Sequence, residues 1–434
     1  MKSTTFVSLP ALTLMSVLAL PVGLKAQPQQ PRYIVVDLGK PGFGGPVSFA
    51  FGINNVGRVT GQAMLPNGNF HAFLSGVGRT LYDLGTLGGP NAGGSAVNSQ
   101  DAVALVSDTA TKDPLGEDYC GFGTNLICRA AVWQGGLVSL APPGGNSSFA
   151  EAINSAGQVA GWGETSVQDP TCGPPQVLRS QAVVWGPGRN EIHPLPPLPG
   201  DTVSFGLAIN DLGQVVGGSG TCANTPLAPF PVGPHAILWV NGTPKDLGSL
   251  TPGGSALNVG ASINNLGMVV GGSRLAGAIH TYLWTAASGM QDLGLLETDL
   301  GNLPGGGMGI NNNGQVVGMS CVNDALCDMS NPEFMSRAYL WQNGKMMDLN
   351  SLVVGGAPLY LVFACQINDA GEIVGFGATA TGDIHAFEAH LIPSPAPREN
   401  VSFDEPRVTG PVALTEAARR VLQRRMSPGA PRVR

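Results

Sequence analysis

Charged and aromatic residues are scarce in this sequence. Only 12% of the 434 residues are charged and 6% are aromatic, and the formal net charge is -7. So few long charged side chains leave little material for the solvated faces of helices, which disfavours a helical fold. The negative balance also disfavours nucleic acid as a partner, because binding to phosphates depends on clustered Lys and Arg.

Motifs of the common enzyme classes are absent as well. The sequence contains no GxSxG, HExxH or GxxxxGK[ST] motif and no CxxC pair. This excludes serine hydrolases with a nucleophile elbow, zinc peptidases and P-loop nucleotide hydrolases on the motifs that carry their chemistry. We assign no catalytic residue from the sequence, and we expect no cofactor and no metal site.

Long hydrophobic runs are limited to one, from Phe6 to Leu20, which follows Lys2 and precedes a small-residue ending at Ala26. This order is typical of a secretion signal. The run is shorter than the ~20 apolar residues that a membrane-spanning helix needs, and no later run reaches that length. We therefore expect a signal peptide over residues 1–26, no transmembrane segment, and a secreted or periplasmic mature protein.

Glycine is abundant, with 63 Gly beside 35 Pro, and it recurs at fixed places. An apolar residue followed by Asn returns seven times, with the Asn at Asn54, Asn98, Asn154, Asn210, Asn264, Asn311 and Asn368. A Gly lies three residues after each Asn and another lies seven residues after it, except in the second copy, which has Asp101 and Leu105 there. Asn-x-x-Gly between apolar runs predicts a tight hairpin in which the Asn side chain bonds to backbone ahead and the Gly adopts a positive φ.

Two further signatures follow each hairpin. A HAFLW-like segment begins at residues 71, 129, 181, 235, 280, 337 and 385, and a DLG-like segment follows it in most copies. Short apolar runs separated by Gly and Asn turns predict antiparallel strands. The residues two and four places before each Asn are mostly Gly, Ala or Ser, so one face of that strand suits the crowded axis of a propeller.

These units predict an all-β fold, a seven-bladed β-propeller over residues 27–392 with four antiparallel strands per blade. The last copy lacks its DLG strand, whereas the chain begins with an unpaired one, YIVVDLG at 33–39. We expect this N-terminal strand to complete the last blade and leave no open sheet edge. The alternative is an open superhelical stack of the same units, because periodicity alone does not show closure.

The INxxGQVVG-like, HAFLW-like and DLG-like signatures, recurring in this order behind the N-terminal apolar run, resemble the HAF family of extracellular repeat proteins of bacteria. The resemblance covers about residues 33–392. It implies secretion and repetition, and it implies no catalytic residue.

The seven cysteines fall into two groups. Six lie in the longer segments between the second and third strands of a unit: Cys120, Cys128, Cys172, Cys222, Cys321 and Cys327. Outside the cytoplasm these are expected to be oxidised. The simplest of the pairings that six cysteines permit joins Cys120 to Cys128, Cys321 to Cys327, and Cys172 to Cys222 between neighbouring blades. Cys365 lies within a predicted strand, and we expect it to be a buried free thiol.

The same longer segments predict a loop face. Alternating connections leave a blade at opposite ends, so these segments lie together, opposite the Asn-x-x-Gly turns. Their acids are candidate ligand-binding residues: Asp113, Glu117, Asp118, Glu164, Asp169, Asp201, Asp324 and Asp328. They would bind a cation or a basic partner. The alternative, solvated loop charge, is favoured because none shows the spacing of a calcium loop.

Two columns of polar residues repeat with the units. His71, His235, His280 and His385 share a position with Arg129, Gln181 and Arg337. Equivalent positions lie one blade apart, too far for a common metal, so we expect structural hydrogen bonds. The repeated Asp of the DLG segments, at Asp37, Asp83, Asp246, Asp292 and Asp348, is expected to cap turns. Glu151 is the only acid three residues before a repeated Asn.

The C-terminal tail, 393–434, is rich in Pro and Arg. Residues 413–426 predict a short basic amphipathic helix. This helix either contacts the anionic cell envelope or the acidic body, or the tail is a disordered solubilising segment.

The whole pattern favours a non-enzymatic binding or interaction module with an unknown extracellular ligand, a glycan or a protein. One alternative is a propeller-type enzyme, a polysaccharide lyase or glycoside hydrolase, acting at the central channel. Such an enzyme requires acidic or His side chains from different blades to converge there. The other alternative is a purely structural surface protein.

Overall fold

The computed structural model describes Met1 and residues 30–39, 43–76, 80–173, 176–188, 191–225, 232–254, 257–296, 301–302, 309–321, 336–392, 408 and 410–426. Residues Pro31–Arg434 form one compact unit. Apart from Met1, the predicted signal peptide lies outside the described residues. In the part of the chain that the structure describes, no helix has the length and hydrophobicity that a membrane span requires.

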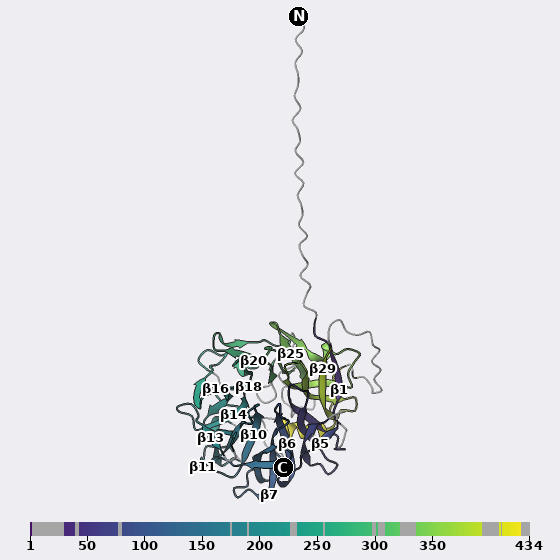
Figure 1. The fold of residues 1–434 in the computed structure, drawn as a ribbon. Coiled ribbons are helices and arrows are strands. Elements are labelled where there is room, and N and C mark those ends of the chain that lie inside the picture. Colours follow the sequence, from purple (N-terminus) through teal and green to yellow (C-terminus); the bar gives the residue numbers. More distant parts are fainter. Residues whose placement is uncertain are drawn as a thin grey trace. The chain divides into compact units, whose positions relative to one another are not determined.

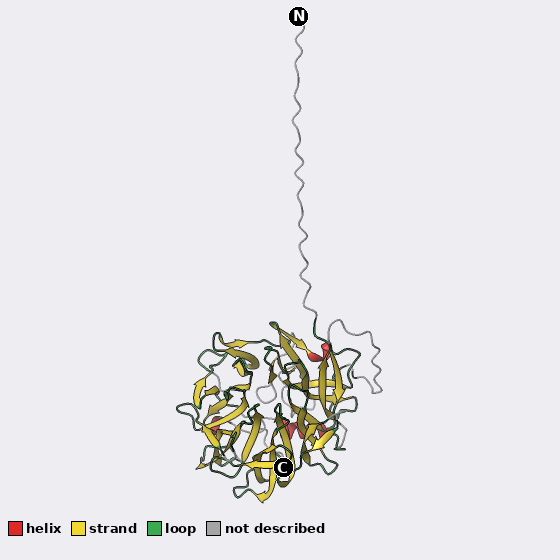
Figure 2. Cartoon of the chain, viewed as in Figure 1, coloured by secondary structure: helices red, strands yellow, loops and turns green. Residues whose placement is uncertain are grey.

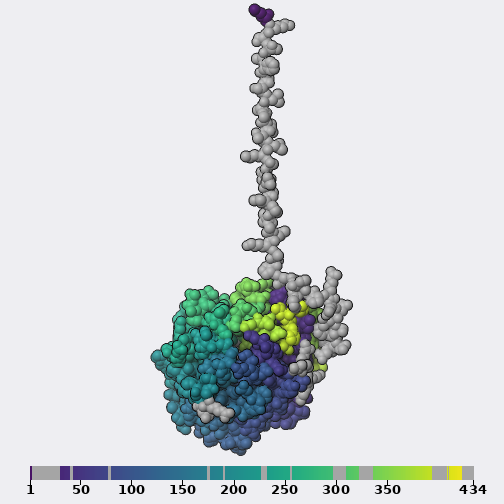
Figure 3. Space-filling model, in the orientation of Figure 1, coloured from purple at the N-terminus to yellow at the C-terminus, as the bar shows by residue number. Residues whose placement is uncertain are grey.

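The compact unit is built almost entirely from strands, arranged as seven antiparallel sheets around a ring (Figures 1 and 2). The first four blades are β2 (Ser48–Ile53), β3 (Val59–Met64), β4 (Phe70–Ser75), β5 (Leu81–Asp83); β6 (Gly88–Val97), β7 (Val103–Lys112), β8 (Leu126–Trp133), β9 (Leu137–Leu140); β10 (Ser148–Ile153), β11 (Val159–Gln168), β12 (Leu178–Trp185), β13 (Ile192–Leu195); and β14 (Val203–Ile209), β15 (Val215–Gly220), β16 (His235–Val240), β17 (Thr243–Asp246). The remaining three are β18 (Asn258–Ile263), β19 (Val269–Leu275), β20 (Ala278–Thr285), β21 (Gly289–Asp292); β22 (Gly301–Asn302) with β23 (Gly309–Ile310), β24 (Val316–Cys321), β25 (Ser336–Gln342), β26 (Lys345–Asp348); and β27 (Leu359–Ile367), β28 (Ile373–Thr379), β29 (Ile384–Leu391) with β1 (Tyr33–Asp37). The space-filling view shows the colours advancing around the body, so blades that follow in sequence are neighbours in space (Figure 3).

The N-terminal strand closes the ring, as the sequence predicts. β1 pairs antiparallel with β29, from Tyr33 opposite Leu391 to Asp37 opposite Phe387, and forms the outer strand of the last blade. The two ends of the repeat region therefore share one sheet. The seven-bladed propeller is thus the fold of this chain, and the open superhelical stack is wrong.

The hydrophobic core lies between the blades rather than in one central mass. Each of seven clusters of buried side chains joins residues of two neighbouring blades. Between the third and fourth blades, for example, Val184 packs in one cluster with Val215 and the fully buried Trp239. A blade buries its faces only against its neighbours, so an incomplete ring would expose apolar surface at the gap.

The repeated Asn-x-x-Gly segments form the tight hairpins that the sequence predicts. At the fourth copy, Oδ1 of Asn210 accepts hydrogen bonds from the backbone N–H of Leu212 at 3.1 Å and of Gln214 at 3.0 Å. Gly213 has a φ of +73°. The second copy lacks the Gly, but Asp101 adopts the same left-handed conformation with a φ of 60°. Asp tolerates this region better than most residues, which explains the exception.

The same Asn side chains connect the blades, which the sequence did not indicate. The amide Nδ2 of Asn54 donates to the backbone carbonyl of Asn98 at 2.8 Å. The equivalent bond leaves every other repeated Asn for the next one, at 2.9–3.1 Å, and Asn368 returns it to Asn54. All seven Asn are buried. A closed circle of seven side-chain hydrogen bonds therefore links the blades near the axis.

A second line of bonds runs beside this circle. The residue after the repeated Asn donates its backbone N–H to the Oδ1 of the equivalent residue in the next blade. Ser155 bonds to Asp211 in this way, and four further pairs follow, each at 2.9 Å: Asp211 to Asn265, Asn265 to Asn312, Asn312 to Asp369 and Asp369 to Asn55. Each turn is therefore held to its neighbour twice at five interfaces.

The Gly seven residues after the Asn is required by a close approach of two backbones. A Cβ atom on Gly217 would lie 1.9 Å from the carbonyl oxygen of Phe205 in the neighbouring strand. The same distance recurs for Gly61, Gly161, Gly271 and Gly375. In each case the inner strand has a register shift one residue further on, between Gly206 and Ala208 in the fourth blade. The bulge brings the strands so close that only Gly fits.

The C-terminal helix α1 (Glu416–Met426) forms within the segment for which the sequence predicts helix. Its Ala418 and Leu422 are buried in a cluster with Val47 and Phe376, from the first and last blades. Just before the helix, the backbone N–H of Thr415 donates to the carbonyl of Gly382 at 2.9 Å. The helix thus docks on the propeller through apolar side chains, so the prediction of a disordered tail is wrong for this part.

We expect Gly217→Ala to lower the free energy of unfolding by roughly 3 kcal/mol or more, because the added methyl group forces two paired strands apart. Gly136→Ala is the matched control, since a Cβ there meets no atom within 4 Å. The control should change stability by about 0.5 kcal/mol or less. Urea unfolding of both variants measures the difference, and equal stabilities would contradict the steric explanation.

Candidate functional site

A cavity of about 390 Å³ lies on the axis of the propeller, and all seven blades contribute to its wall. This central channel is lined by the inner strands and by the circle of Asn turns. Its volume falls within the range of ordinary small-molecule pockets. The channel is therefore a concave site of the size that small molecules occupy.

The bulge in each inner strand decides which side chain lines the channel. The register shift leaves one residue unpaired, three places before the repeated Asn, and that residue belongs to the channel wall in every blade where it is described: Phe51, Ser95, Glu151, Leu207, Ala261 and Cys365. The residues on either side of it are small, except Gln366 in the last blade. The bulged position is thus where side chains of different size and chemistry enter the channel wall.

Glu151 is the single acid at this bulged position. Burial raises the pKa of Glu151 from an ordinary value of 4.5 to about 8. The carboxyl group therefore keeps its proton at neutral pH and can donate a hydrogen bond. Next to it on the wall, Phe149 stacks on Trp162 with ring centroids 4.6 Å apart.

The other carboxylates of the channel wall are Asp211 and Asp369, which belong to the turns. Asp211 accepts from the backbone N–H of Ser155 and from Nδ2 of Asn265. Asp369 accepts from the backbone N–H and Nδ2 of Asn312. Both side chains are committed to the bonds between blades, which leaves Glu151 as the carboxyl group that faces the cavity.

The acids of the predicted loop face are mostly not solvated. Asp113, Glu117, Asp118, Glu164 and Asp169 are all 7% exposed or less. Asp201 is half-buried and bonds to the Ser219 hydroxyl. Asp324 and Asp328 lie outside the described residues. The expectation of solvated charge is therefore wrong for five of these acids, because the long segments fold back on the blades.

Three of these acids converge. Asp113 and Glu117 come from the segment after β7, and Glu164 comes from β11 in the next blade. Ligand atoms of the three carboxylates lie within 4.8 Å of one another. Burial, together with the neighbouring Glu117 carboxyl group, raises the pKa of Glu164 to about 9. We call these three residues the buried carboxylate cluster.

The remaining two buried acids have separate partners. Asp169 forms an ion pair with Nε of Arg179 at 2.8 Å and accepts from the Thr171 hydroxyl. Asp118 accepts from the backbone N–H of Gly123 at 2.9 Å. Neither side chain belongs to the cluster, so their burial is explained by local hydrogen bonding.

Two of the three predicted disulfides are present. Cys120 bonds to Cys128 within one long segment, and Cys172 bonds to Cys222 between the third and fourth blades. Cys321 is disulfide-bonded, and its predicted partner Cys327 lies outside the described residues. Cys365 is a buried free cysteine, as predicted.

The repeated His and Asp columns turn out to be partners. Nδ1 of His71 bonds to Asp83, and His235 to Asp246, His280 to Asp292 and His385 to Asp37 are equivalent pairs at 2.8–3.2 Å. Arg337 replaces His in an ion pair with Asp348. The other oxygen of each Asp caps the following turn, for example at the backbone N–H of Gly85. The structural hydrogen bonds and the turn caps are both as predicted.

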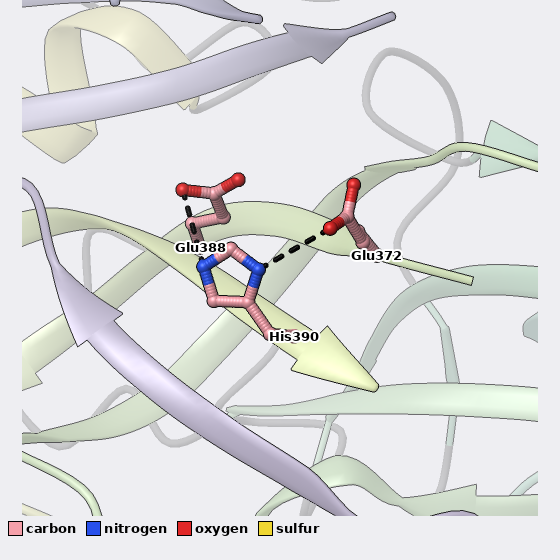
Figure 4. Close-up of side chains that lie close together, drawn as sticks. All are labelled: Glu372, Glu388 and His390. Carbon is pink, nitrogen blue, oxygen red and sulfur yellow. Dashed lines mark hydrogen bonds and ion pairs between the residues drawn. The ribbon is translucent and has the colours of Figure 1, made fainter. Parts of the chain in front are cut away.

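One further cluster lies at the seam of the ring. Figure 4 shows the imidazole of His390 between the carboxylates of Glu372 and Glu388. Nδ1 lies 3.3 Å from Glu372, and Nε2 lies 3.5 Å from Glu388. The neighbouring Glu388 and Glu372 carboxylates raise the pKa of His390. Glu372 also accepts from Nδ2 of Asn368, so this cluster supports the turn that closes the circle.

Solved structures that resemble the chain share little of its sequence. No protein-family model matches the chain, and no curated protein matches it. The acylaminoacyl peptidase of Pyrococcus horikoshii is 12% identical, with a TM-score of 0.43 over 67% of this chain and 43% of its own. TolB of Acinetobacter baumannii is 10% identical, with a TM-score of 0.39 over 69% of this chain and 62% of its own. A lectin of Aleuria aurantia is 7% identical, with a TM-score of 0.32 over 81% of this chain and 97% of its own.

This chain covers less than two thirds of the first two structures. Similarities at this level do not bear on what the chain binds or catalyses.

We expect Glu151→Gln to remove part of the loss of stability that occurs on raising the pH. The folded pKa of Glu151 lies near 8, above its ordinary value of 4.5, so the folded state binds the extra proton between these values. Stability from this group is full below pH 4.5 and is lost as the pH rises through 8. The variant should gain stability relative to the wild type between pH 5 and pH 9. Thermal unfolding at both pH values measures the gain.

The exposed Glu191 supplies the control for this prediction. Glu191→Gln should leave the pH dependence unchanged. A wild-type and Glu151→Gln pair that respond identically to pH would show that Glu151 is ionised in the folded protein.

Proposed function

We propose that this chain is a secreted binding module of the HAF repeat type, which takes an uncharged, hydroxyl-rich ligand, such as the end of a glycan chain, in its central channel. The observation that carries the proposal is the composition of the channel wall. Gln62 and Gln366 lie on the wall, and the Glu151 carboxyl group is neutral at pH 7. Such groups offer hydrogen bonds without charge.

Apolar surface accompanies these polar groups. Phe51, Leu207 and the stacked Phe149 line the same cavity. A wall that combines ring faces with a few placed hydrogen-bonding groups is typical of small-molecule sites. Placement outside the cytoplasm is supported by the two disulfides, which persist in oxidising compartments.

A propeller-type enzyme is the second candidate, and the raised pKa of Glu151 is the observation that favours it. A carboxyl group that holds its proton at neutral pH suits a general acid. Glycoside hydrolysis, however, uses a pair of carboxyl groups about 5–10 Å apart. The other described carboxylates of the wall, Asp211 and Asp369, are bound within the circle of turns. Binding therefore fits this wall better than hydrolysis.

Blocking the channel tests the proposal. Ala261 occupies the bulged position of the fifth blade, where the first blade has Phe51. Ala261→Phe should therefore fold and fill part of the cavity, with a loss of ligand affinity of roughly tenfold or more, equivalent to about 1.4 kcal/mol. Leu266→Phe, at an exposed turn position of the same blade, should bind as the wild type does. Glycan arrays and soluble peptidoglycan fragments provide the ligands, and titration calorimetry gives the affinities.

Two results would contradict the proposal. If both variants bind the ligand equally well, the ligand does not bind in the channel. If the wild type hydrolyses a polysaccharide and Glu151→Gln does not, the protein is an enzyme.

A further inference from the structure

The buried carboxylate cluster is built by the backbone around it. Oδ1 of Asp113 accepts from the backbone N–H of Leu115 at 2.8 Å and of Glu117 at 3.2 Å. Oε2 of Glu164 accepts from the backbone N–H of Asn146 at 2.9 Å and of Ser147 at 2.7 Å. Each carboxylate is thereby fixed in orientation through one of its two oxygens.

Glu117 follows the same arrangement. Its Oε1 accepts from the backbone N–H of Val177 and, at 3.3 Å, from that of Leu178. These donors belong to the third blade, while Glu117 itself comes from the segment after the second strand of the second blade. Six backbone N–H groups therefore hold three carboxylates from two blades.

The second oxygen of each carboxylate is buried without a hydrogen-bond partner. These atoms are Oδ2 of Asp113, Oε2 of Glu117 and Oε1 of Glu164. The three residues are 6%, 1% and 0% exposed. Buried acceptors without partners are uncommon in folded proteins, and three that belong to one cluster call for a shared partner.

A cation satisfies this arrangement. Three ionised carboxylates away from water repel one another and lose their hydration, and both costs are offset when they coordinate a metal ion. The nearby Arg129 acts electrostatically on Glu164, but it is a single cation beside three carboxyl groups. From this geometry we infer that Asp113, Glu117 and Glu164 bind a divalent cation, and that the cation is Ca²⁺.

The donor set selects calcium. All three ligand atoms are carboxylate oxygens, which are the ligands of hard cations. Zinc sites mostly use His or Cys. Cys120, three residues after Glu117, is joined to Cys128 in a disulfide. Mg²⁺ keeps several waters and is usually held by one or two carboxylates, whereas Ca²⁺ accepts more protein ligands in a less regular geometry.

Bound calcium would also shape the channel. Tyr119, Cys120 and Gly121 lie two to four residues after Glu117, and all three line the central channel. An ion held between Glu117 and Glu164 ties this stretch to the third blade. The site is therefore a structural clamp on one wall of the channel, and its existence does not depend on what the channel binds.

The test measures binding of Ca²⁺ itself to the full mature chain after treatment with EDTA. Calorimetry should show one Ca²⁺ per chain, and Ca²⁺ should raise the melting temperature because it binds only the folded state. Glu117→Gln should weaken Ca²⁺ binding roughly tenfold or more, since affinity follows the charge of the ligands. Asp169→Asn, which alters a buried acid of the same face outside the cluster, should bind Ca²⁺ as the wild type does.

Three results would overturn the inference. The first is an unchanged melting temperature of the wild type in millimolar Ca²⁺, with no heat of binding. The second is equal response to Mg²⁺ and Ca²⁺, which would remove calcium as the ion. The third is a Glu117→Gln variant that is more stable than the wild type with and without Ca²⁺, as expected of two carboxyl groups that share a proton. If that variant fails to fold, calcium titration of the wild type still decides the question.

Discussion

The circle of hydrogen bonds between repeated Asn residues is the interaction on which this fold depends. Each Asn uses Oδ1 to shape its own hairpin and Nδ2 to bond the next blade, so local turn and global closure share one side chain. A substitution in one copy therefore affects both roles at once, because the same amide group supplies the acceptor of the hairpin and the donor to the next blade. β1 also closes the ring, at the outer edge of the last blade, where it joins the two ends of the repeat region in one sheet.

Closure at the axis leaves two places free to differ between blades. One is the bulged residue of the inner strand, where Phe51, Glu151 and Cys365 occupy equivalent positions of the channel wall. The other is the segment between the second and third strands, where the second blade folds its acids onto the third. The side chains that line the channel and the buried carboxylate cluster both lie at these variable places. The ring of blades holds both in fixed positions.

Much of this architecture could be predicted from spacing alone. The Asn-x-x-Gly hairpins, the unpaired YIVVDLG strand and the Cys120–Cys128 disulfide follow from short sequence patterns, because turn chemistry and strand alternation act over a few residues. The bonds from Asn210 to Asn264 and from His71 to Asp83 could not be predicted in this way, since each joins residues that only the folded sheets bring together.

The candidate site was harder to predict than the fold, for the same reason. A calcium loop is recognisable when one segment supplies the ligands, but Asp113 and Glu164 meet across two blades. Their burial is decided by how a long segment folds back, which no repeat encodes. The repeat spacing places Glu151 three residues before a repeated Asn. Its raised pKa comes from burial at the bulge of the folded inner strand, which the spacing does not reveal.

The most direct test of this account is the stability of Asn210→Asp. Aspartate keeps an oxygen for the N–H groups of Leu212 and Gln214. It can donate neither to the carbonyl of Asn264 in the next blade nor to Oε1 of Gln214. Asn67→Asp, at an exposed turn whose Asn only accepts, is the control. Urea unfolding should show a loss of about 3 kcal/mol for Asn210→Asp and of about 0.5 kcal/mol or less for the control. Equal unfolding free energies would show that the blades do not depend on the circle of Asn bonds.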